Sequence, residues 1–279
     1  MLILLCAALS SLFAPAAPAQ EALNMDSATQ PSPGVIYLYE RARYTRYGRS
    51  PHDNNTDHND RTTQLRLETS IIAGLTRDLA LLATIPVEKR TEHTISGDSD
   101  SDFGLADPEI LFKYRIYKSD SGTLDTLRVA LLAGAEIPSG DGNFTSGSVD
   151  PIVGIAATTI RGRHGLNAAA RFKFNTGGDD EHNLGGDGPH DALWYNASYL
   201  YRLAPGAWTA TSSAALYAVL ELNGLYETNG DNEILLSPGL LYEARTWAGE
   251  IGARIPIIED VNDRPEMDWG MTVGVRFLF

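Results

Sequence analysis

The stretch that decides the fold is Met267 to Phe279, with the sequence MDWGMTVGVRFLF. Trp269, Met271 and Val273 begin a series of apolar side chains at alternate positions, and the positions between them hold Gly, Thr, Arg and Leu. A side-chain period of two indicates a β-strand, because successive residues of a strand point to opposite faces. The pattern predicts a strand with one face toward an apolar environment and the other toward a polar one.

The N-terminal stretch predicts export. It reads MLILLCAALSSLFAPAAPAQ, in which the apolar run from Leu2 to Phe13 is too short to span a bilayer. Ala17-Pro18-Ala19 offers a cleavage motif with small residues at its first and third positions. We therefore expect three parts: a signal peptide over residues 1–19, a flexible leader over 20–33 and a single β domain over 34–279.

Composition excludes several classes of function. The formal net charge of −14 argues against a nucleic-acid partner, which would require a basic surface. Cys6 is the only cysteine and lies in the expected signal peptide, so the exported chain must fold without disulfides. No apolar run after the signal approaches the roughly 18 residues that a membrane helix needs. A membrane-spanning form of this chain would therefore cross with strands.

Extended segments with alternating polarity recur from Val35 onward. In one of them Ile110, Phe112 and Tyr114 share a face, and Lys113 and Arg115 lie opposite. The first and sixth segments are ambiguous in their faces. An even number of strands brings both ends of the chain to the same side, as single-chain bacterial barrels require. We expect twelve strands, at residues 35–46, 62–74, 79–90, 106–117, 126–137, 149–161, 165–175, 191–202, 208–222, 233–245, 246–258 and 267–279.

Connection lengths favour a barrel over a sandwich. Short turns are expected after the even-numbered strands and longer loops after the odd-numbered ones, the longer ones at 47–61, 91–105, 138–148, 176–190, 223–232 and 259–266. Alternation of this kind is typical of transmembrane barrels, whereas Greek-key crossings would scatter the loop lengths. The terminal strand, with Phe277 and Phe279 at its end, resembles the assembly signal of bacterial outer-membrane barrels. The sequence thus predicts an all-β fold, a transmembrane antiparallel up-and-down β-barrel in the bacterial outer membrane.

Charge is partitioned between loops and strands. Acidic residues greatly outnumber basic ones in the long loops, so we expect an external acidic rim that includes Asp98, Asp100, Asp102, Asp179, Asp180 and Glu181. The strands carry both signs, and an Arg or Lys facing lipid at the membrane midplane costs roughly 2–4 kcal/mol. Their charged faces should therefore line the lumen. The expected pore-lining residues are Arg66, Glu68, Glu88, Glu109, Lys113, Arg115, Arg128, Glu136, Arg171, Lys173, Glu243, Glu250, Arg254 and Arg276.

Mixed charges leave two interpretations of the lumen open. They can line a polar path for solutes, or they can form salt bridges that fill a narrow barrel. Asp98, Asp100 and Asp102 have calcium-loop spacing, but Phe103 stands where that loop requires Gly, and diffuse cation bridges to lipopolysaccharide phosphates fit better. All six histidines fall in loops or turns, without a serine nucleophile singled out by spacing. We therefore expect no metal site, no cofactor and no catalytic residues.

Two short motifs carry a resemblance to a known family. They are DFGLADPEILFKYRIY (Asp102 to Tyr117) and AGAEIPSGDGN (Ala133 to Asn143), followed by SVDPIVGIAA from Ser148. The chain resembles the family named for a meta-pathway of phenol degradation, whose members are predicted outer-membrane barrels. The resemblance implies uptake of small molecules, including aromatic or hydrocarbon compounds. The motif residues themselves are interpreted as strand punctuation, because Pro and Gly end strands.

These observations predict an exported outer-membrane channel or uptake protein for small molecules. Its expected partners are outer-membrane lipids, the outer-membrane assembly machinery and a small-molecule solute, with no nucleic acid. Two alternatives remain open. One is a closed structural or surface-binding barrel without transport, and the other is an outer-membrane hydrolase.

Overall fold

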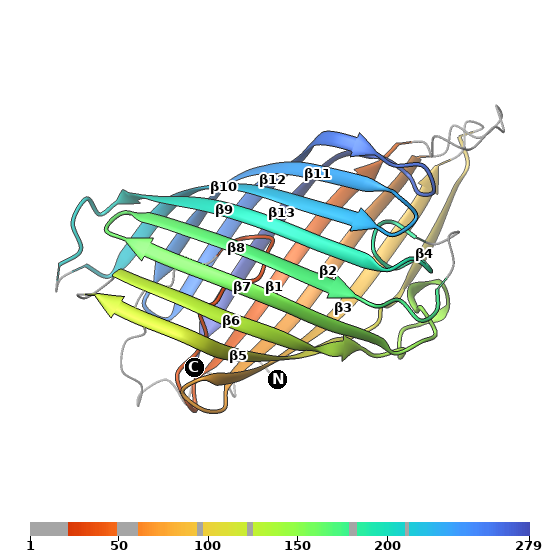
Figure 1. Cartoon of the computed structure of the whole chain (residues 1–279). Helices are drawn as coiled ribbons and strands as arrows, with labels where there is room; N and C mark the ends of the chain where they lie inside the picture. The colour runs from red at the N-terminus through yellow and green to blue at the C-terminus, as the bar shows by residue number, and fades with distance from the viewer. Residues whose placement is uncertain (1–21, 49–60, 94–96, 122–124, 179–182, 210–211) are drawn as a thin grey trace, which may run out of the picture.

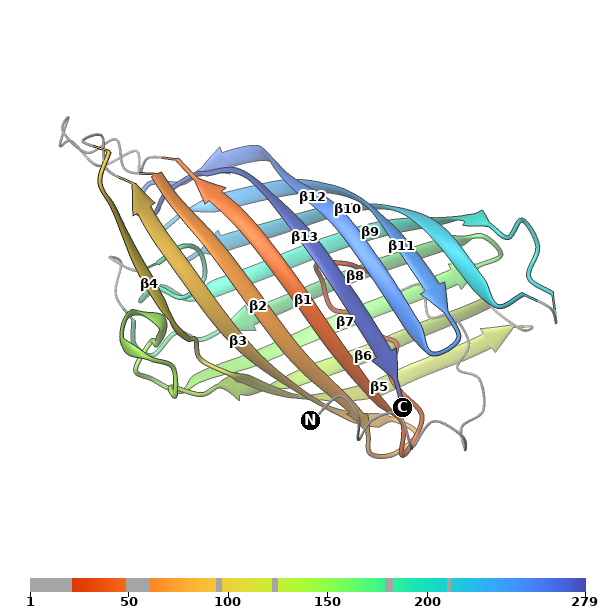
Figure 2. The ribbon, with the colours of Figure 1, turned by 180° about the vertical axis from the view of Figure 1, so that it is seen from behind.

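A computed structural model of the protein describes residues 22–48, 61–93, 97–121, 125–178, 183–209 and 212–279. These residues form one antiparallel sheet that curves into a closed ring (Figures 1 and 2). A short 3-10 helix, η1 (Gly142–Phe144), interrupts one loop. The thirteen strands of the sheet are β1 (Ile36–Tyr47), β2 (Arg61–Gly74), β3 (Leu79–His93), β4 (Ser99–Leu105), β5 (Glu109–Ser121), β6 (Asp125–Glu136), β7 (Asp150–Arg161), β8 (His164–Lys173), β9 (Ala192–Ala204), β10 (Ala214–Glu227), β11 (Asn232–Ala244), β12 (Trp247–Asp260) and β13 (Met267–Leu278).

The ring has twelve strands around its circumference because β4 and β5 share one edge of β3. Leu79 to Thr84 of β3 pair with β5, and Val87 to His93 pair with β4. Every other strand pairs with its neighbours in sequence, and β13 pairs with β1. The predicted twelve-stranded up-and-down barrel is confirmed. No helix in the described part of the chain is long and apolar enough to cross a membrane.

The β1–β13 pairing closes the barrel. Ile36 and Phe279 exchange two backbone hydrogen bonds, of 3.0 and 2.8 Å, and Leu38 lies opposite Phe277 in the register. Closure matters because an open sheet edge would leave backbone N–H and C=O groups without partners in an apolar environment. The residues predicted to end the chain's last strand are therefore the ones that complete the ring.

The two faces of β13 are as predicted. Trp269 and Val273 point outward and are more than two-fifths exposed, at 42% and 43%, and Phe277 lies on the same face. Thr272 and Arg276 point inward and are buried. Aromatic pairs lie toward both ends of the outer surface, with Tyr44 and Trp269 5.4 Å apart and Tyr242 and Trp247 5.2 Å apart between ring centroids. An apolar outer face bounded by aromatic rings is typical of a barrel in a lipid bilayer.

Three predicted connections are wrong. Residues 91–105, predicted as a loop, include the end of β3 and all of β4. The loop predicted at 223–232 shrinks to residues 228–231, because β10 continues to Glu227. Gly224 lies within the strand and makes room for the Tyr195 ring, since a Cβ at this position would lie 2.2 Å from that ring. At the other end β10 begins at Ala214 instead of residue 208, so strict alternation of loop lengths fails around this strand.

The predicted flexible leader does not describe residues 22–33. Figures 1 and 2 show this N-terminal segment, drawn in red, inside the ring of strands. Leu23 is fully buried in an apolar cluster that includes Tyr217 and Leu241, and Ala28 is fully buried in a second cluster with Leu111. The segment therefore runs inside the barrel and packs against strands β9 to β12 at Leu23 and against β5 to β8 at Ala28.

The exposed outer position of Phe277 leads to a prediction about assembly. Phe277→Glu places a charge on the apolar face of the closing strand, where a carboxylate is poorly solvated. We expect less folded barrel in the outer-membrane fraction, measured by heat-modifiable migration on denaturing gels. Phe277→Leu is the matched control and should assemble normally. Assembly of Phe277→Glu at the wild-type level would contradict the role given to this face.

Candidate functional site

A polar cavity of about 360 Å³ occupies the middle of the lumen. Asn24, Met25 and Asp26 of the N-terminal segment line it on one side, and Leu184 and Asp187 of the loop between β8 and β9 line it toward the long-loop end. Strand side chains form the wall between them. The described residues therefore enclose the cavity between an inner segment and a folded-in loop.

Glu221 anchors the N-terminal segment. This fully buried carboxylate of β10 accepts hydrogen bonds from the backbone N–H groups of Leu23 and Asn24, at 2.6 and 3.0 Å. The Asn24 side chain adds a third bond to Glu221 and accepts one from Thr272 at 2.9 Å. The backbone N–H of Ala28 donates to Thr158 at 2.9 Å. Side chains of three strands thus supply hydrogen-bond partners for the polar groups of a segment that has no regular secondary structure.

One wall of the cavity carries a ladder of alternating charges across β1, β2 and β3. Glu68 lies between Arg43 and Arg66, at 2.5 and 3.1 Å. Glu88 in turn contacts Arg66 and lies 3.0 Å from Arg90. The strand register places Arg43 directly opposite Arg66, and the shared carboxylate between them offsets the repulsion of the two cations. The structure thus brings together three of the predicted pore-lining residues, Arg66, Glu68 and Glu88.

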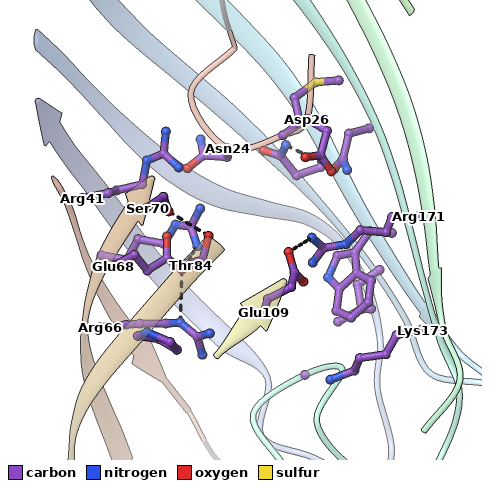
Figure 3. Close-up of a pocket in the computed structure, with 18 of the residues that line it drawn as sticks. Asn24, Asp26, Arg41, Arg66, Glu68, Ser70, Thr84, Glu109, Arg171 and Lys173 are labelled. Carbon is purple, nitrogen blue, oxygen red and sulfur yellow. Dashed lines mark hydrogen bonds and ion pairs between the residues drawn. The ribbon is translucent and has the colours of Figure 1, made fainter. Parts of the chain in front are cut away.

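The facing wall, on β5, β6 and β8, carries a second charged cluster (Figure 3). Arg171 bonds Glu109 at 3.0 Å, and Lys173 lies 3.0 Å from Glu136. Trp194 lies beneath both cations, with its ring centroid 4.9 Å from the Arg171 guanidinium carbon. The positive charges over the ring face form cation–π contacts. All four of these charged residues were predicted to line the pore.

Asp187 belongs to a predicted external loop but turns into the lumen. Its carboxylate lies 2.7 Å from the ammonium of Lys173. Burial opposes ionisation of this carboxyl group, yet the charges of Lys173 and Arg66 outweigh burial and hold the pKa of Asp187 at about 2. The loop therefore stays attached to the charged wall by an ionised group across the neutral pH range.

The other predicted pore-lining residues divide into two groups. Lys113, Glu243, Glu250, Arg254 and Arg276 face the interior: Arg276 bonds Glu243 at 2.6 Å, Glu250 bonds Arg41 at 2.7 Å and Lys113 donates to the Thr29 carbonyl. Arg115 and Arg128 instead lie at the short-turn rim. Arg115 bonds Asp78 in the β2–β3 turn at 2.9 Å, and Arg128 contacts Thr126 and Asp120. A register shift in β5 after Arg115 accompanies this change.

The predicted acidic rim is only partly described. Asp100 and Asp102 lie exposed on β4, and Asp98 precedes that strand. Asp179, Asp180 and Glu181 lie outside the described residues. Within the described ranges no group of three His, Cys, Asp or Glu side chains could hold a metal ion. His164 contacts the Tyr199 hydroxyl at 2.7 Å, and no serine hydroxyl there is hydrogen-bonded to a histidine.

Asp107 organises the motif region, a role that the sequence pattern did not predict. Its buried carboxylate accepts backbone N–H bonds from Ser139, Gly140 and Ser146, at 2.8 to 2.9 Å. Gly140 has no room for a side chain, since a Cβ there would lie 2.8 Å from the Leu105 carbonyl oxygen. The Ala-Asp-Pro and Pro-Ser-Gly-Asp motifs therefore join the β4–β5 break to the β6–β7 loop. A structural role accounts for these short motifs.

Two further groups were also missed. Arg41 and Arg43 of β1 line the cavity, but β1 carries charges on both faces and its orientation was ambiguous. Arg264, in a predicted external loop, is almost fully buried against Glu227 at 2.7 Å. The sequence feature that could have indicated its burial is that it is a single basic residue in an acidic loop.

A family model with the description "Putative MetA-pathway of phenol degradation" matches residues 53–268. The chain belongs to this family. The comparison with curated proteins found no match. The family resemblance inferred from the motifs is thus confirmed over most of the chain.

Solved structures with the same fold come from outer-membrane proteins. An outer membrane channel from Pseudomonas putida F1 is 11% identical, with a TM-score of 0.56 over 93% of this chain and 100% of that chain. The β domain of the Bordetella autotransporter Brka is 11% identical, with a TM-score of 0.51 over 89% of this chain and 100% of that chain. At these identities the likeness shows the fold of this phenol-degradation family member and nothing finer.

The charge ladder leads to a prediction about stability. Glu88→Gln keeps the shape of a fully buried side chain but leaves Arg66 and Arg90 without their shared carboxylate. We expect the free energy of unfolding to fall by roughly 2–3 kcal/mol, less than for an isolated buried charge because both guanidinium groups are partly solvated. Urea unfolding of the refolded barrel measures this. Exposed Glu92→Gln on the same strand is the control, and equal stability of both variants would contradict the prediction.

Proposed function

We propose that this protein is an outer-membrane channel for small solutes, with a path narrowed by its own N-terminal segment. The observation that supports the proposal most strongly is the position of the polar cavity. It lies inside a closed barrel whose outer face is apolar, and charged side chains of both signs line it. A structural barrel needs no water-accessible space at its centre, whereas a channel does.

The lining suggests weak discrimination by net charge. Seven basic and seven acidic side chains of the described residues line the cavity. Most of them form ion pairs, so the interior field acts on solutes locally and not as one strong charge. The exposed carboxylates of Asp98, Asp100 and Asp102 at the long-loop end add a modest attraction for cations.

Uptake of aromatic or hydrocarbon compounds stays a prediction from the family resemblance. Tyr47, Leu235 and Met267 form one apolar cluster of the lining, with Leu184 beside it. Other apolar side chains line the cavity elsewhere, among them Met25, Ile72, Leu82, Trp194 and Leu225. The remainder of the lining is mainly polar and charged. The cavity therefore favours solutes with polar or charged groups over pure hydrocarbons.

A closed barrel without transport is the second candidate. The N-terminal segment across the lumen favours it, because the segment and the inward loop leave only a narrow space between them. The two candidates differ in what happens when the segment is released. A channel should widen, whereas a barrel sealed by its salt bridges should stay closed.

Release of the segment supplies the test. Leu23→Asp removes an apolar contact worth about 2 kcal/mol and would bury an unpaired charge, so the segment should leave its place. We expect a small single-channel conductance for the wild type in a planar bilayer and a larger conductance for Leu23→Asp. Leu23→Met keeps the apolar contact and should behave as wild type.

Heat-modifiable migration on gels confirms that each variant is folded before recording. Folded barrels that conduct in neither form would contradict the channel proposal and favour the closed barrel. A conducting wild type with an unchanged Leu23→Asp variant would contradict only the role of the segment.

The exposed rim carboxylates lead to a prediction about ion selectivity. Replacing Asp98, Asp100 and Asp102 together by Asn should reduce a weak cation preference, measured from reversal potentials in a salt gradient. The effect should fade as salt rises, because charges are screened over about 10 Å at 0.1 M ionic strength. A strong anion preference in the wild type would show that the inner basic residues control passage instead.

A further inference from the structure

Two opposite charges line the same part of the cavity without pairing to one another. They are Arg254 of β12 and Glu233 of β11. No described carboxylate pairs with Arg254, and the nearest cation to Glu233 is Arg264, at 3.7 Å. Their surroundings indicate what could occupy the space between them.

Arg254 differs from Glu250, which lies four residues earlier on β12, in the partner that it finds across β13 and β1. We call the residues that lie opposite one another on these three strands a row. In its own row Glu250 crosses Gly274 of β13 and bonds Arg41 of β1 at 2.7 Å. A Cβ on Gly274 would lie 2.6 Å from the Glu250 carboxylate, so the missing side chain makes room for this ion pair. In this row a carboxylate and a guanidinium therefore form an ion pair across a glycine.

The Arg254 row also has a glycine on β13, but its residue on β1 is a neutral threonine. Arg254 lies opposite Gly270, and Gly270 lies opposite Thr45. The guanidinium donates to the neutral Thr45 hydroxyl at 3.3 Å, and no described carboxylate lies within ion-pair distance of it. Since a guanidinium has five N–H donors in a planar fork, most of them are left for another acceptor.

Glu233 is the matching acceptor, because one of its carboxylate oxygens has no hydrogen-bond partner. It is 5% exposed, and its Oε1 atom is buried without a hydrogen-bond partner. Its other oxygen lies 3.7 Å from Arg264, whose closer partner is Glu227 at 2.7 Å. A buried carboxylate oxygen without a donor costs free energy unless a ligand or water supplies one.

An apolar cluster lies between the two charges. Leu235 follows Glu233 by two residues on the same face of β11 and lies opposite Pro256, two residues beyond Arg254. Leu235 contacts Tyr47 and Met267 in a buried group. From the register, Glu233 and Arg254 are offset by about four residues along their strands, or roughly 13 Å between backbones. The site therefore consists of a cation, a short apolar stretch and an anion.

We propose that this part of the cavity binds a small zwitterionic solute, with its carboxylate on Arg254, its ammonium on Glu233 and its methylene chain against Tyr47, Leu235 and Met267. The inference rests on the proposed channel function for the route by which the solute reaches the site. A net anion would satisfy Arg254 and leave Glu233 unpaired, and a net cation would do the reverse. A solute with both charges at its two ends satisfies both, and the cavity's balanced lining adds no penalty for a neutral molecule.

Equilibrium dialysis of the folded full-length barrel in detergent tests the site directly. The probe is labelled 6-aminohexanoate, with unlabelled glycine, 4-aminobutanoate, hexanoate and hexylamine as competitors. We expect affinity to rise from glycine to 6-aminohexanoate as the separation of the charges grows, and hexanoate and hexylamine to compete poorly. Arg254→Gln and Glu233→Gln should each weaken binding about tenfold, the effect of losing one hydrogen bond to a charged group.

The controls are Arg61→Gln and Glu92→Gln, which remove exposed charges at the long-loop end and should leave binding unchanged. Glu233→Gln preserves the side-chain shape, and gel migration shows whether each variant is folded. Equal competition by hexanoate, with loss of binding only in Arg254→Gln, would overturn the proposal in favour of a simple anion site. Absence of 6-aminohexanoate binding to the folded wild type would also overturn it.

Planar-bilayer recording separates failure of this site from failure of the channel function. A wild type that conducts but does not bind the probe defeats the zwitterion site alone. A wild type that binds the probe but never conducts defeats the channel function and leaves a binding barrel. In a conducting wild type, 6-aminohexanoate should reduce the open-channel current at lower concentrations than hexanoate does.

Discussion

The structure depends on one constraint, the pairing of every backbone N–H and C=O group of a sheet that faces an apolar environment. Without water to satisfy these groups, an open edge is not stable, and the sheet must close on itself. The β1–β13 ladder closes the sheet, and the hydrogen bonds between Ile36 and Phe279 extend it one residue beyond β13. Alternate side chains then have only two destinations, the outer surface and the lumen. The apolar series of β13 takes the first, and Thr272 and Arg276 take the second.

The lumen is lined by charged side chains, because they cannot face the apolar outer surface. The ladder of arginines and glutamates on β1 to β3 and the cluster around Lys173 each pair most of their charges. The charged side chains of each group find their main partners on neighbouring strands. The N-terminal segment and the loop that carries Asp187 then enter the remaining space, bonded to Glu221 and Lys173. A polar cavity is left between them, bounded by charged groups that are mostly paired.

Much of this could be read from the sequence because a period of two is a strong local signal. It located the twelve strands around the ring and placed residues such as Glu88, Glu109 and Lys173 on the inner face. The strand that begins after Asp107-Pro108 was predicted, but β4 was missed because residues 91–105 were interpreted as a loop. The tertiary contacts of Asp107 were not predictable, because its partners lie more than thirty residues away in the β6–β7 loop. Arg41 and Arg43 were missed because β1 has charged residues on both faces, including Glu40, which bonds Thr69 on the outside. The N-terminal segment has no periodicity, and its place depends on distant partners: Glu221 and Thr158, which accept its hydrogen bonds, and the apolar clusters around Leu23 and Ala28.

Amide hydrogen exchange of the folded barrel tests the central claim, that residues 22–33 are an integral part of the lumen. The informative amides are those of Leu23, Asn24 and Ala28, which donate to Glu221 and Thr158 inside the barrel. If the segment is held as described, these amides should exchange slowly, at rates closer to strand amides than to a free peptide. Exchange at the rate of an unstructured chain would contradict the account, because the lumen would then be bounded by the strands and the inward loop alone.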